Sequence, residues 1–170
     1  RNVDNVLFGM KRLGHKSKTE KHAVAMDILG VVGLKGFESH YPWQVSGGMQ
    51  QRVAIARALA SEARLLLLDE PLAAVDAQTR NEIQDLLLDL ARRFGKTCLL
   101  VTHDVDEAVY LADRIVVLSQ RPTRVVHEFA VMLPKPRDQI TTRADPDYLH
   151  LRADLMNMIR SMPKATHPQH

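Results

Sequence analysis

The stretch Val45-Ser46-Gly47-Gly48-Met49-Gln50-Gln51-Arg52 decides the fold, together with a second stretch, Leu65-Leu66-Leu67-Leu68-Asp69-Glu70-Pro71. The first predicts a Ser-Gly-Gly loop that opens a helix over residues 47–60. The second predicts a short strand that ends in two adjacent carboxylates. A fully apolar strand is typical of a parallel sheet that is buried on both faces. Ligands of open α/β sheets bind at the carboxyl ends of such strands, so the carboxylates are candidate site residues.

The flanking sequence continues the alternation of helices and strands, which predicts a layered α/β fold. Ser17 and Glu20 form a capping-box pattern that begins a helix ending near Val32. The further predicted elements are a helix that ends at Gly95, a strand over 97–102, a helix from Asp104 to about Ala112, strands over 114–118 and 124–133, and a helix from Asp145-Pro146 to about Ser161. Residues 162–170 are predicted to be disordered.

Composition fits one soluble globular domain or most of one. The chain has 170 residues, of which 45% are apolar and 25% charged, and its net charge of +3 is too small to indicate nucleic acid. It has no apolar run of the roughly 18 residues that a membrane-spanning helix needs. A single cysteine, Cys98, excludes a disulfide within the chain. Because Cys98 lies in an apolar run, we predict a buried, inert thiol.

Ser46, Gly47 and Gly48 form a candidate anion site. Free backbone N–H groups and the helix dipole attract anions to a helix N-terminus, and glycine lets a phosphate approach the backbone. The structural alternative is a simple helix cap. Trp43, just before this loop, is expected to be a packing residue.

Asp69 and Glu70 form the second candidate site. Adjacent residues of a strand point to opposite sides, so one carboxylate can face a magnesium ion and the other a water molecule. The structural alternative is a pair of polar residues that ends the strand. His103 follows the next strand and should lie at the same ligand-facing edge, while Asp76 is expected to cap the helix after Glu70.

These motifs resemble those of ABC-type ATPases over nearly the whole chain. Residues 41–60 resemble the signature region, Leu65–Glu70 the Walker B strand, and Thr102–Pro122 the switch region, while residues 5–10 resemble the segment after the Q-loop. The Arg121-Pro122 turn and the Leu-Pro-Lys-Pro-Arg stretch that ends at Arg137 are similar to those of the nitrate, sulfonate and taurine importers.

The resemblance implies the C-terminal portion of a P-loop NTPase-like ABC ATPase domain. Its expected parts are a helical subdomain over 1–60, a parallel-sheet core over 61–133, and a C-terminal helix and tail over 134–170. Two such subunits would sandwich two ATP molecules, as a homodimer on the cytoplasmic face of the membrane. The expected partners are permease subunits and, indirectly, a solute-binding protein, without nucleic acid.

The resemblance also implies a role for each candidate residue. Residues 46–48 would contact the γ-phosphate of the partner's ATP, and Gln50 would also belong to the nucleotide-binding residues. Asp69 would hold Mg²⁺ through water, and Glu70 would polarise the attacking water. His103 would contact the γ-phosphate, and Asp76 would couple the two sites. Such catalysis consists mostly of positioning and charge stabilisation of a loose phosphoryl transition state.

The sequence departs from the family in one major respect, because it contains no phosphate-binding P-loop (Walker A motif). Gly95-Lys96-Thr97 runs from helix to strand, the wrong direction, and in residues 9–17 His15 displaces the lysine by one position. We therefore interpret the chain as part of an intact ATPase and expect it to bind ATP poorly and to be inactive alone. Met49 is a milder departure, since it replaces the usual Gln of the signature.

Two other functions remain open. A soluble ABC ATPase that acts on DNA or ribosomes carries the same motifs, but the DNA-repair types have long coiled coils, and only a short connector separates Arg52 from Arg64. A hydrolysis-dead interaction module would have lost Glu70 or His103, and both are present. An importer ATPase is therefore the favoured interpretation, although the transported solute cannot be inferred from this chain.

Overall fold

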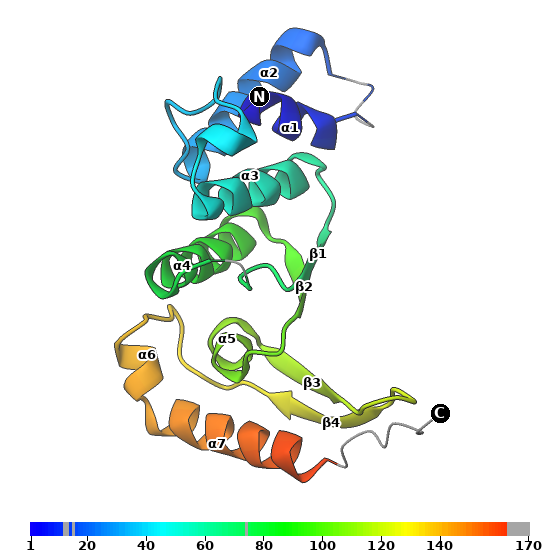
Figure 1. The fold of residues 1–170 in the computed structure, drawn as a ribbon, viewed down its shortest axis with the longest axis vertical. Helices are drawn as coiled ribbons and strands as arrows, with labels where there is room; N and C mark the ends of the chain where they lie inside the picture. The colour runs from blue at the N-terminus through cyan, green and yellow to red at the C-terminus, as the bar shows by residue number, and fades with distance from the viewer. Residues whose placement is uncertain (12–13, 15, 74, 163–170) are drawn as a thin grey trace. The chain divides into compact units, whose positions relative to one another are not determined.

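The computed structural model describes residues 1–11, 14, 16–73 and 75–162, which belong to two compact units (Figure 1). The first unit is Arg1–Val101, and the second begins at Thr102. The domain boundaries expected from the sequence stay a prediction. None of the helices within the described ranges is long and apolar enough to cross a membrane.

The first unit combines helices with a parallel pair of strands. Its elements are α1 (Asn2–Gly9), α2 (Lys18–Val31), a 3₁₀ turn (Pro42–Gln44), α3 (Gly47–Ala60), β1 (Leu65–Asp69), α4 (Ala77–Phe94) and β2 (Thr97–Val101). The predicted capping box of α2 is confirmed, because Ser17 Oγ accepts from Glu20 N at 3.2 Å and the Glu20 carboxylate accepts from Ser17 N at 2.7 Å. Gly95 ends α4 in the left-handed conformation, with φ +57°.

Helix α3 is the centre of packing in the first unit, because α1, α2 and α4 all lie against it (Figure 1). The core contains Val6, Met10, Leu29, Val53 and Ala56. Gly9 marks the closest approach of α1 to α3. A Cβ at Gly9 would lie 2.3 Å from the backbone oxygen of Arg57, so only glycine fits there. The helix that begins at the Ser-Gly-Gly loop thus packs against three other helices.

The strands β1 and β2 pair in parallel, with Leu67 opposite Leu99 and Asp69 opposite Val101. The prediction that β1 lies in a sheet buried on both faces is wrong in this structure. Leu67 is 70% exposed and Leu99 56%, whereas Leu66, which points to the other face, is buried. The physical reason is that an apolar run specifies a strand but not what covers it. The described residues form a two-stranded sheet with one uncovered apolar face.

Cys98 is exposed on β2, so the prediction that it is buried is also wrong. Neighbouring atoms nevertheless desolvate the sulfur, and this raises the pKa of the Cys98 thiol. A thiol with a raised pKa carries little thiolate at neutral pH, which agrees with the expected lack of reactivity.

The second unit combines three helices with an antiparallel hairpin, and two tyrosines, Tyr110 and Tyr148, are buried in it. Its elements are α5 (Val105–Leu111), β3 (Arg114–Leu118), β4 (Val125–Ala130), α6 (Thr141–Ala144) and α7 (Pro146–Ser161). The strand predicted over 124–133 is shorter than expected. As predicted, α7 begins at Asp145-Pro146, and Asp145 Oδ1 accepts from Asp147 N at 2.8 Å. Except for Met162, which ends α7, the segment predicted to be disordered lies outside the described residues.

Candidate functional site

Ser46 begins α3 as its N-cap. Its backbone is extended, with φ −63° and ψ +162°, and its Oγ accepts from Met49 N at 3.2 Å. The capping alternative raised from the sequence is therefore observed. A cap of this kind satisfies only one N–H of the first turn, so it is compatible with an anion at the same helix end. Gly47 is exposed there, whereas Gly48 is buried.

Gly48 brings the N-terminus of α3 against the first turn of α4. A Cβ at Gly48 would lie 2.3 Å from Thr79 Cγ2, so the contact requires glycine. Asp76 caps α4, as expected, and its Oδ1 accepts from Thr79 N at 3.0 Å. This hydrogen bond lowers the pKa of Asp76. Two candidate residue sets, 46–48 and Asp76, thus begin two helices that meet through Thr79, and two positive helix ends are brought together.

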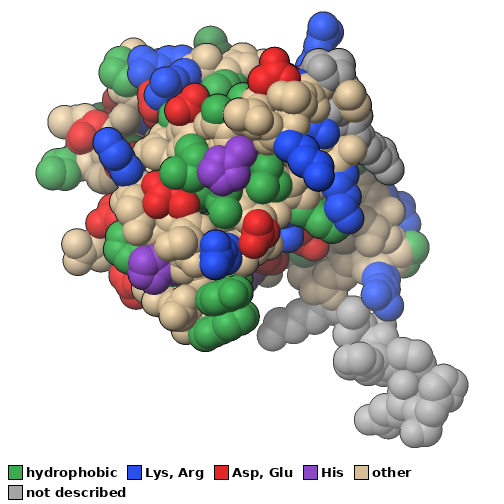
Figure 2. All heavy atoms as spheres, turned by 90° about the horizontal axis from the view of Figure 1, so that it is seen from above, with side chains coloured by type: hydrophobic (Ala, Val, Ile, Leu, Met, Phe, Trp, Pro, Cys, Tyr) green, Lys and Arg blue, Asp and Glu red, His purple; other side chains and the backbone are tan. Residues whose placement is uncertain are grey.

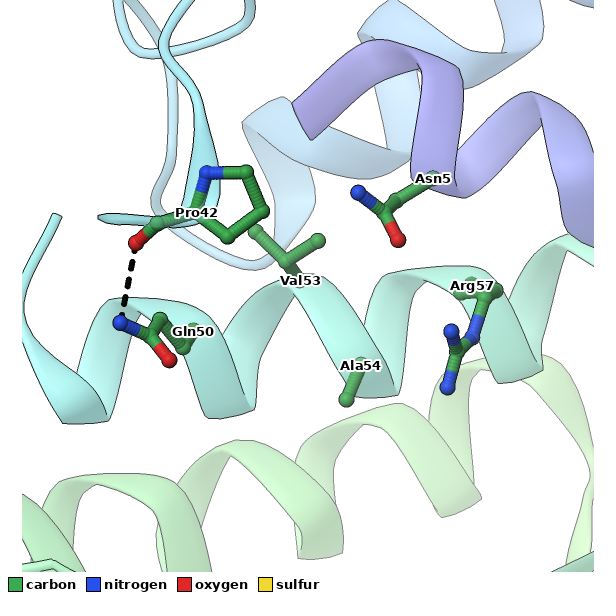
Figure 3. A pocket seen from close by; sticks show the side chains of 6 residues that line it. All are labelled: Asn5, Pro42, Gln50, Val53, Ala54 and Arg57. Atoms are coloured by element: carbon green, nitrogen blue, oxygen red, sulfur yellow. Dashed lines mark hydrogen bonds between the residues drawn. The ribbon is translucent and has the colours of Figure 1, made fainter. Parts of the chain in front are cut away.

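Gln50 lies one turn into α3 and holds the loop that precedes Ser46. Its side-chain nitrogen donates to Pro42 O at 2.9 Å, as Figure 3 shows. The same nitrogen donates to Val45 O at 3.3 Å. In this arrangement Gln50 fixes the loop, while its assigned contact with nucleotide stays a prediction. The residues around it line a shallow pocket of about 170 Å³, formed by Asn5, Pro42, Gln50, Val53, Ala54 and Arg57.

Trp43 is 76% exposed, so the expectation that it packs beside the signature loop is wrong. Its ring stacks on Tyr41, with centroids 4.5 Å apart and an angle of 9° between the ring planes. The two side chains lie in the loop that Gln50 holds.

Asp69 is the last residue of β1, and Glu70 follows it in a turn. The backbone nitrogen of Glu70 still donates to Val101 O at 2.9 Å, but Glu70 has φ +46°. Side chains alternate between the two faces only in extended backbone, and Glu70 is not extended. The prediction that Asp69 and Glu70 point to opposite sides therefore does not apply. A left-handed glutamate stores backbone strain on the order of 1–3 kcal/mol, and such strain clusters at functional sites. Glu62, which belongs to no motif, has a similar φ of +57°, so this conformation alone does not distinguish Glu70.

Asp69 is exposed at the end of β1 and can supply one carboxylate oxygen to a metal ion. Across the described ranges there is no group of three or more His, Cys, Asp or Glu side chains that could hold a metal ion. Mg²⁺ commonly binds through one or two carboxylates together with water and substrate phosphates. The residues present therefore fit a magnesium ion that arrives with a phosphate ligand, rather than an ion held by the protein alone.

His103 lies in the second unit, exposed in the segment that leads into α5. The residues on either side of it are fixed. Thr102 Oγ1 accepts from Asp104 N at 3.0 Å and donates to Glu107 Oε2 at 2.6 Å. Asp104 caps α5, as predicted, by accepting from Asp106 N at 2.9 Å and Glu107 N at 3.2 Å. The backbone that presents His103 is thus held at both ends.

Two side chains that sequence reasoning missed take part in these arrangements. Thr79 joins the two helix N-termini, and Arg152 binds Asp106 in the first turn of α5. Neither belongs to a motif, and neither contact is local in the sequence. No signal in the sequence alone could have found them.

The Ser-Gly-Gly start of α3 and the carboxylates after β1 resemble the corresponding motifs of ABC-type ATPases. The family model described as ABC transporter matches residues 2–73. The taurine import ATP-binding protein TauB of Escherichia coli is 43% identical over 164 residues, which are 94% of this chain and 64% of TauB. The chain is similar to ABC transporter ATP-binding proteins over most of its length.

Two further similarities extend this result. The aliphatic sulfonates import ATP-binding protein SsuB 2 of Pseudomonas syringae pv. tomato is 55% identical, over 76% of this chain and 54% of SsuB 2. The dimeric structure of a bacterial ABC transporter cassette matches with a TM-score of 0.65 and 37% identity, over 76% of this chain and 56% of that one. The chain thus spans between about half and two thirds of the length of these relatives.

Proposed function

We propose that this chain is the C-terminal portion of the ATPase subunit of an ABC importer, and that the ATPase drives uptake of a small anionic solute of the nitrate, sulfonate or taurine type. The relatives named for taurine and aliphatic sulfonates import support the solute class. The observation that carries the proposal is the meeting of the α3 and α4 N-termini through Gly48 and Thr79. Two helix N-termini that lie together favour an anion, which supports a phosphate contact of the signature residues.

The signature residues would act on ATP held by a second subunit. Backbone N–H groups at Gly47 and Gly48 would donate to the γ-phosphate, and Asp76 at the neighbouring helix end would couple the two subunits. The similarity to a dimeric cassette supports this arrangement, and a homologous cassette structure contains ADP and Pi. The chain contains no P-loop sequence, so we propose that it binds ATP poorly alone. The protein that joins these residues to a P-loop is called the full-length ATPase below.

The carboxylates after β1 would supply the groups that act on water and metal. Asp69 would hold Mg²⁺ through water, and the ion would neutralise charge on the phosphates when bound. Glu70 would orient and polarise the attacking water, for which its strained backbone supports a fixed direction. His103 would contact the γ-phosphate from the fixed segment before α5.

We further propose that the ATPase lies on the cytoplasmic face of the membrane, bound to permease subunits and reached indirectly by a solute-binding protein. Nucleic acid is not a proposed partner. On the face that Figure 2 presents, Lys and Arg side chains occur together with Asp and Glu side chains, and the net charge of +3 is too small to indicate a nucleic-acid surface.

The test compares Gly47→Glu with Gly47→Gln in the full-length ATPase. An acidic residue in the first helical turn stabilises a helix, so the Glu variant should fold at least as well as the Gln variant. Its carboxylate should repel the γ-phosphate, and ATP turnover should be at least about tenfold lower than in the Gln variant, since lost electrostatic stabilisation costs roughly 10²–10³. Equal turnover in the two variants, with equal melting temperatures, would contradict a phosphate contact at this helix end.

A further inference from the structure

The C-terminal helix α7 is attached to the first turn of α5 through Asp106. Arg152 Nε donates to Asp106 Oδ1 at 2.6 Å, and Arg152 Nη2 donates to Oδ2 at 3.2 Å, which is a bidentate pair. The Tyr148 hydroxyl lies 3.2 Å from both the backbone oxygen and Oδ1 of Asp106. Two residues of α7 therefore hold one residue of α5, through both its side chain and its backbone.

The turn that contains Asp106 also fixes the segment around His103. The N-cap Asp104 accepts from the backbone of Asp106 and Glu107, and the Glu107 side chain accepts from Thr102. A continuous set of hydrogen bonds thus runs from α7 through the start of α5 to the residues that flank His103. A shift of the α5 N-terminus would move the backbone that presents this histidine.

We propose that Arg152 and Tyr148 are positioning residues for His103: by holding Asp106 they orient the start of α5 and keep the histidine in place for ATP hydrolysis. This inference rests on the proposed function, in which His103 contacts the γ-phosphate. It assigns the C-terminal helix a role in catalysis that none of the motifs of this chain indicates. Neither residue touches ATP in this account.

The exposure of the pair favours a positioning role over a stabilising one. The Asp106 side chain is 38% exposed and the Arg152 side chain 42%, and exposed ion pairs add little to the free energy of unfolding. A bidentate pair does, however, fix direction as well as distance. The hydrogen bond from Arg152 lowers the pKa of Asp106, so the carboxylate is charged at neutral pH and the pair is formed. The Tyr148 side chain is buried, so its position, and that of the hydroxyl that contacts Asp106, is fixed by packing.

The experiment measures kcat, ATP affinity and melting temperature of the full-length ATPase with Arg152→Ala, Arg152→Lys and Arg160→Ala. Because small misplacements of reacting groups are costly, Arg152→Ala should lower kcat by on the order of tenfold and leave ATP affinity unchanged. It should lower the melting temperature only slightly, because the ion pair is partly exposed. Arg152→Lys keeps the positive charge but cannot make the two parallel hydrogen bonds of a guanidinium group. Its kcat should therefore lie between those of Arg152→Ala and the parent. Arg160, an exposed arginine of the same helix with no hydrogen bond to α5 among the described residues, is the matched control and should change nothing.

A double-mutant cycle with His103→Ala decides whether the effect acts through the histidine. If it does, Arg152→Ala should cause no further loss of kcat in the His103→Ala background. A further loss there, or an unchanged kcat in Arg152→Ala alone, would overturn the positioning role. If His103→Ala itself leaves hydrolysis unchanged, the proposed role of the histidine fails and the positioning inference fails with it. If only His103→Ala slows hydrolysis, the proposed function stands and the positioning inference alone is refuted.

Discussion

Gly48 should be intolerant of even one added methyl group, because α3 and α4 meet at that residue. In Gly48→Ala the new Cβ would lie 2.3 Å from Thr79 Cγ2, and the other Thr79 side-chain atoms are within 3.7 Å. Thr79 is β-branched and has few side-chain rotamers, so rotation offers little relief. The helices must therefore separate, which would disturb the surface formed by their N-termini.

The expected loss of stability in Gly48→Ala is the cost of overpacking minus the gain in helix propensity. Overpacking of a tight contact costs roughly 1–3 kcal/mol, whereas alanine in a helix is favoured over glycine by at most about 1 kcal/mol. Gly48→Ala should thus lower the free energy of unfolding by about 1–2 kcal/mol. Gly30→Ala is the matched control. Gly30 also lies near a helix end, but nothing lies within 4 Å of its added Cβ, so this variant should be as stable as the parent or slightly more stable.

Urea denaturation of the full-length ATPase, followed by far-UV circular dichroism, measures both variants. Thr79→Ser removes the methyl group of Thr79 and keeps its hydroxyl, so Gly48→Ala combined with Thr79→Ser should recover most of the lost stability. ATP turnover should fall and recover in parallel. If Gly48→Ala is as stable as Gly30→Ala, or if Thr79→Ser does not rescue it, the reasoning that Gly48 joins the two helix N-termini is refuted.

Two further predictions concern stability. Gly9→Ala would place a Cβ 2.3 Å from the backbone oxygen of Arg57, which cannot rotate away. This variant should therefore lower the free energy of unfolding by roughly 1–3 kcal/mol. If the same urea titration shows a smaller loss of stability than for Gly48→Ala, the close contact of Gly9 with Arg57 is contradicted. The pKa of Asp106 is lowered by Arg152, so its contribution to stability is present above the unfolded pKa of about 3.9 and is lost as pH falls through the folded value. The difference in melting temperature between the parent and Asp106→Asn should therefore be largest near neutral pH and should close below about pH 4; a difference that stays constant with pH would count against the pair.

The local features of this chain could be predicted from its sequence because the interactions that create them are local. Ser17, Ser46, Asp76 and Asp145 each cap a helix as expected, since a capping side chain and its N–H partner lie within three residues. The same holds for the left-handed Gly95, which ends α4. Helices and strands are therefore found close to their predicted positions.

The features that could not be predicted depend on packing between distant segments. The apolar run of β1 indicates a strand, but whether Leu67 is covered depends on what packs on the sheet. The contact of Gly48 with Thr79 and the pair of Arg152 with Asp106 each join separate helices. The positive φ of Glu70 is also invisible in the sequence, because glutamate seldom adopts it. Motifs thus identified the candidate residues, and the structure showed that residues 46–48 and Asp76 begin two helices that meet.

The most direct test of the central claim is ATP turnover by the full-length ATPase with Glu70→Gln, measured beside ATP binding by the same protein. Glutamine keeps the size of the side chain but cannot take a proton, and a positioned base contributes roughly 10² to 10⁴ to a rate. We predict that turnover falls by about 10² or more while ATP binding is retained. Turnover within about tenfold of the parent would contradict the assignment of Glu70 as the group that activates water.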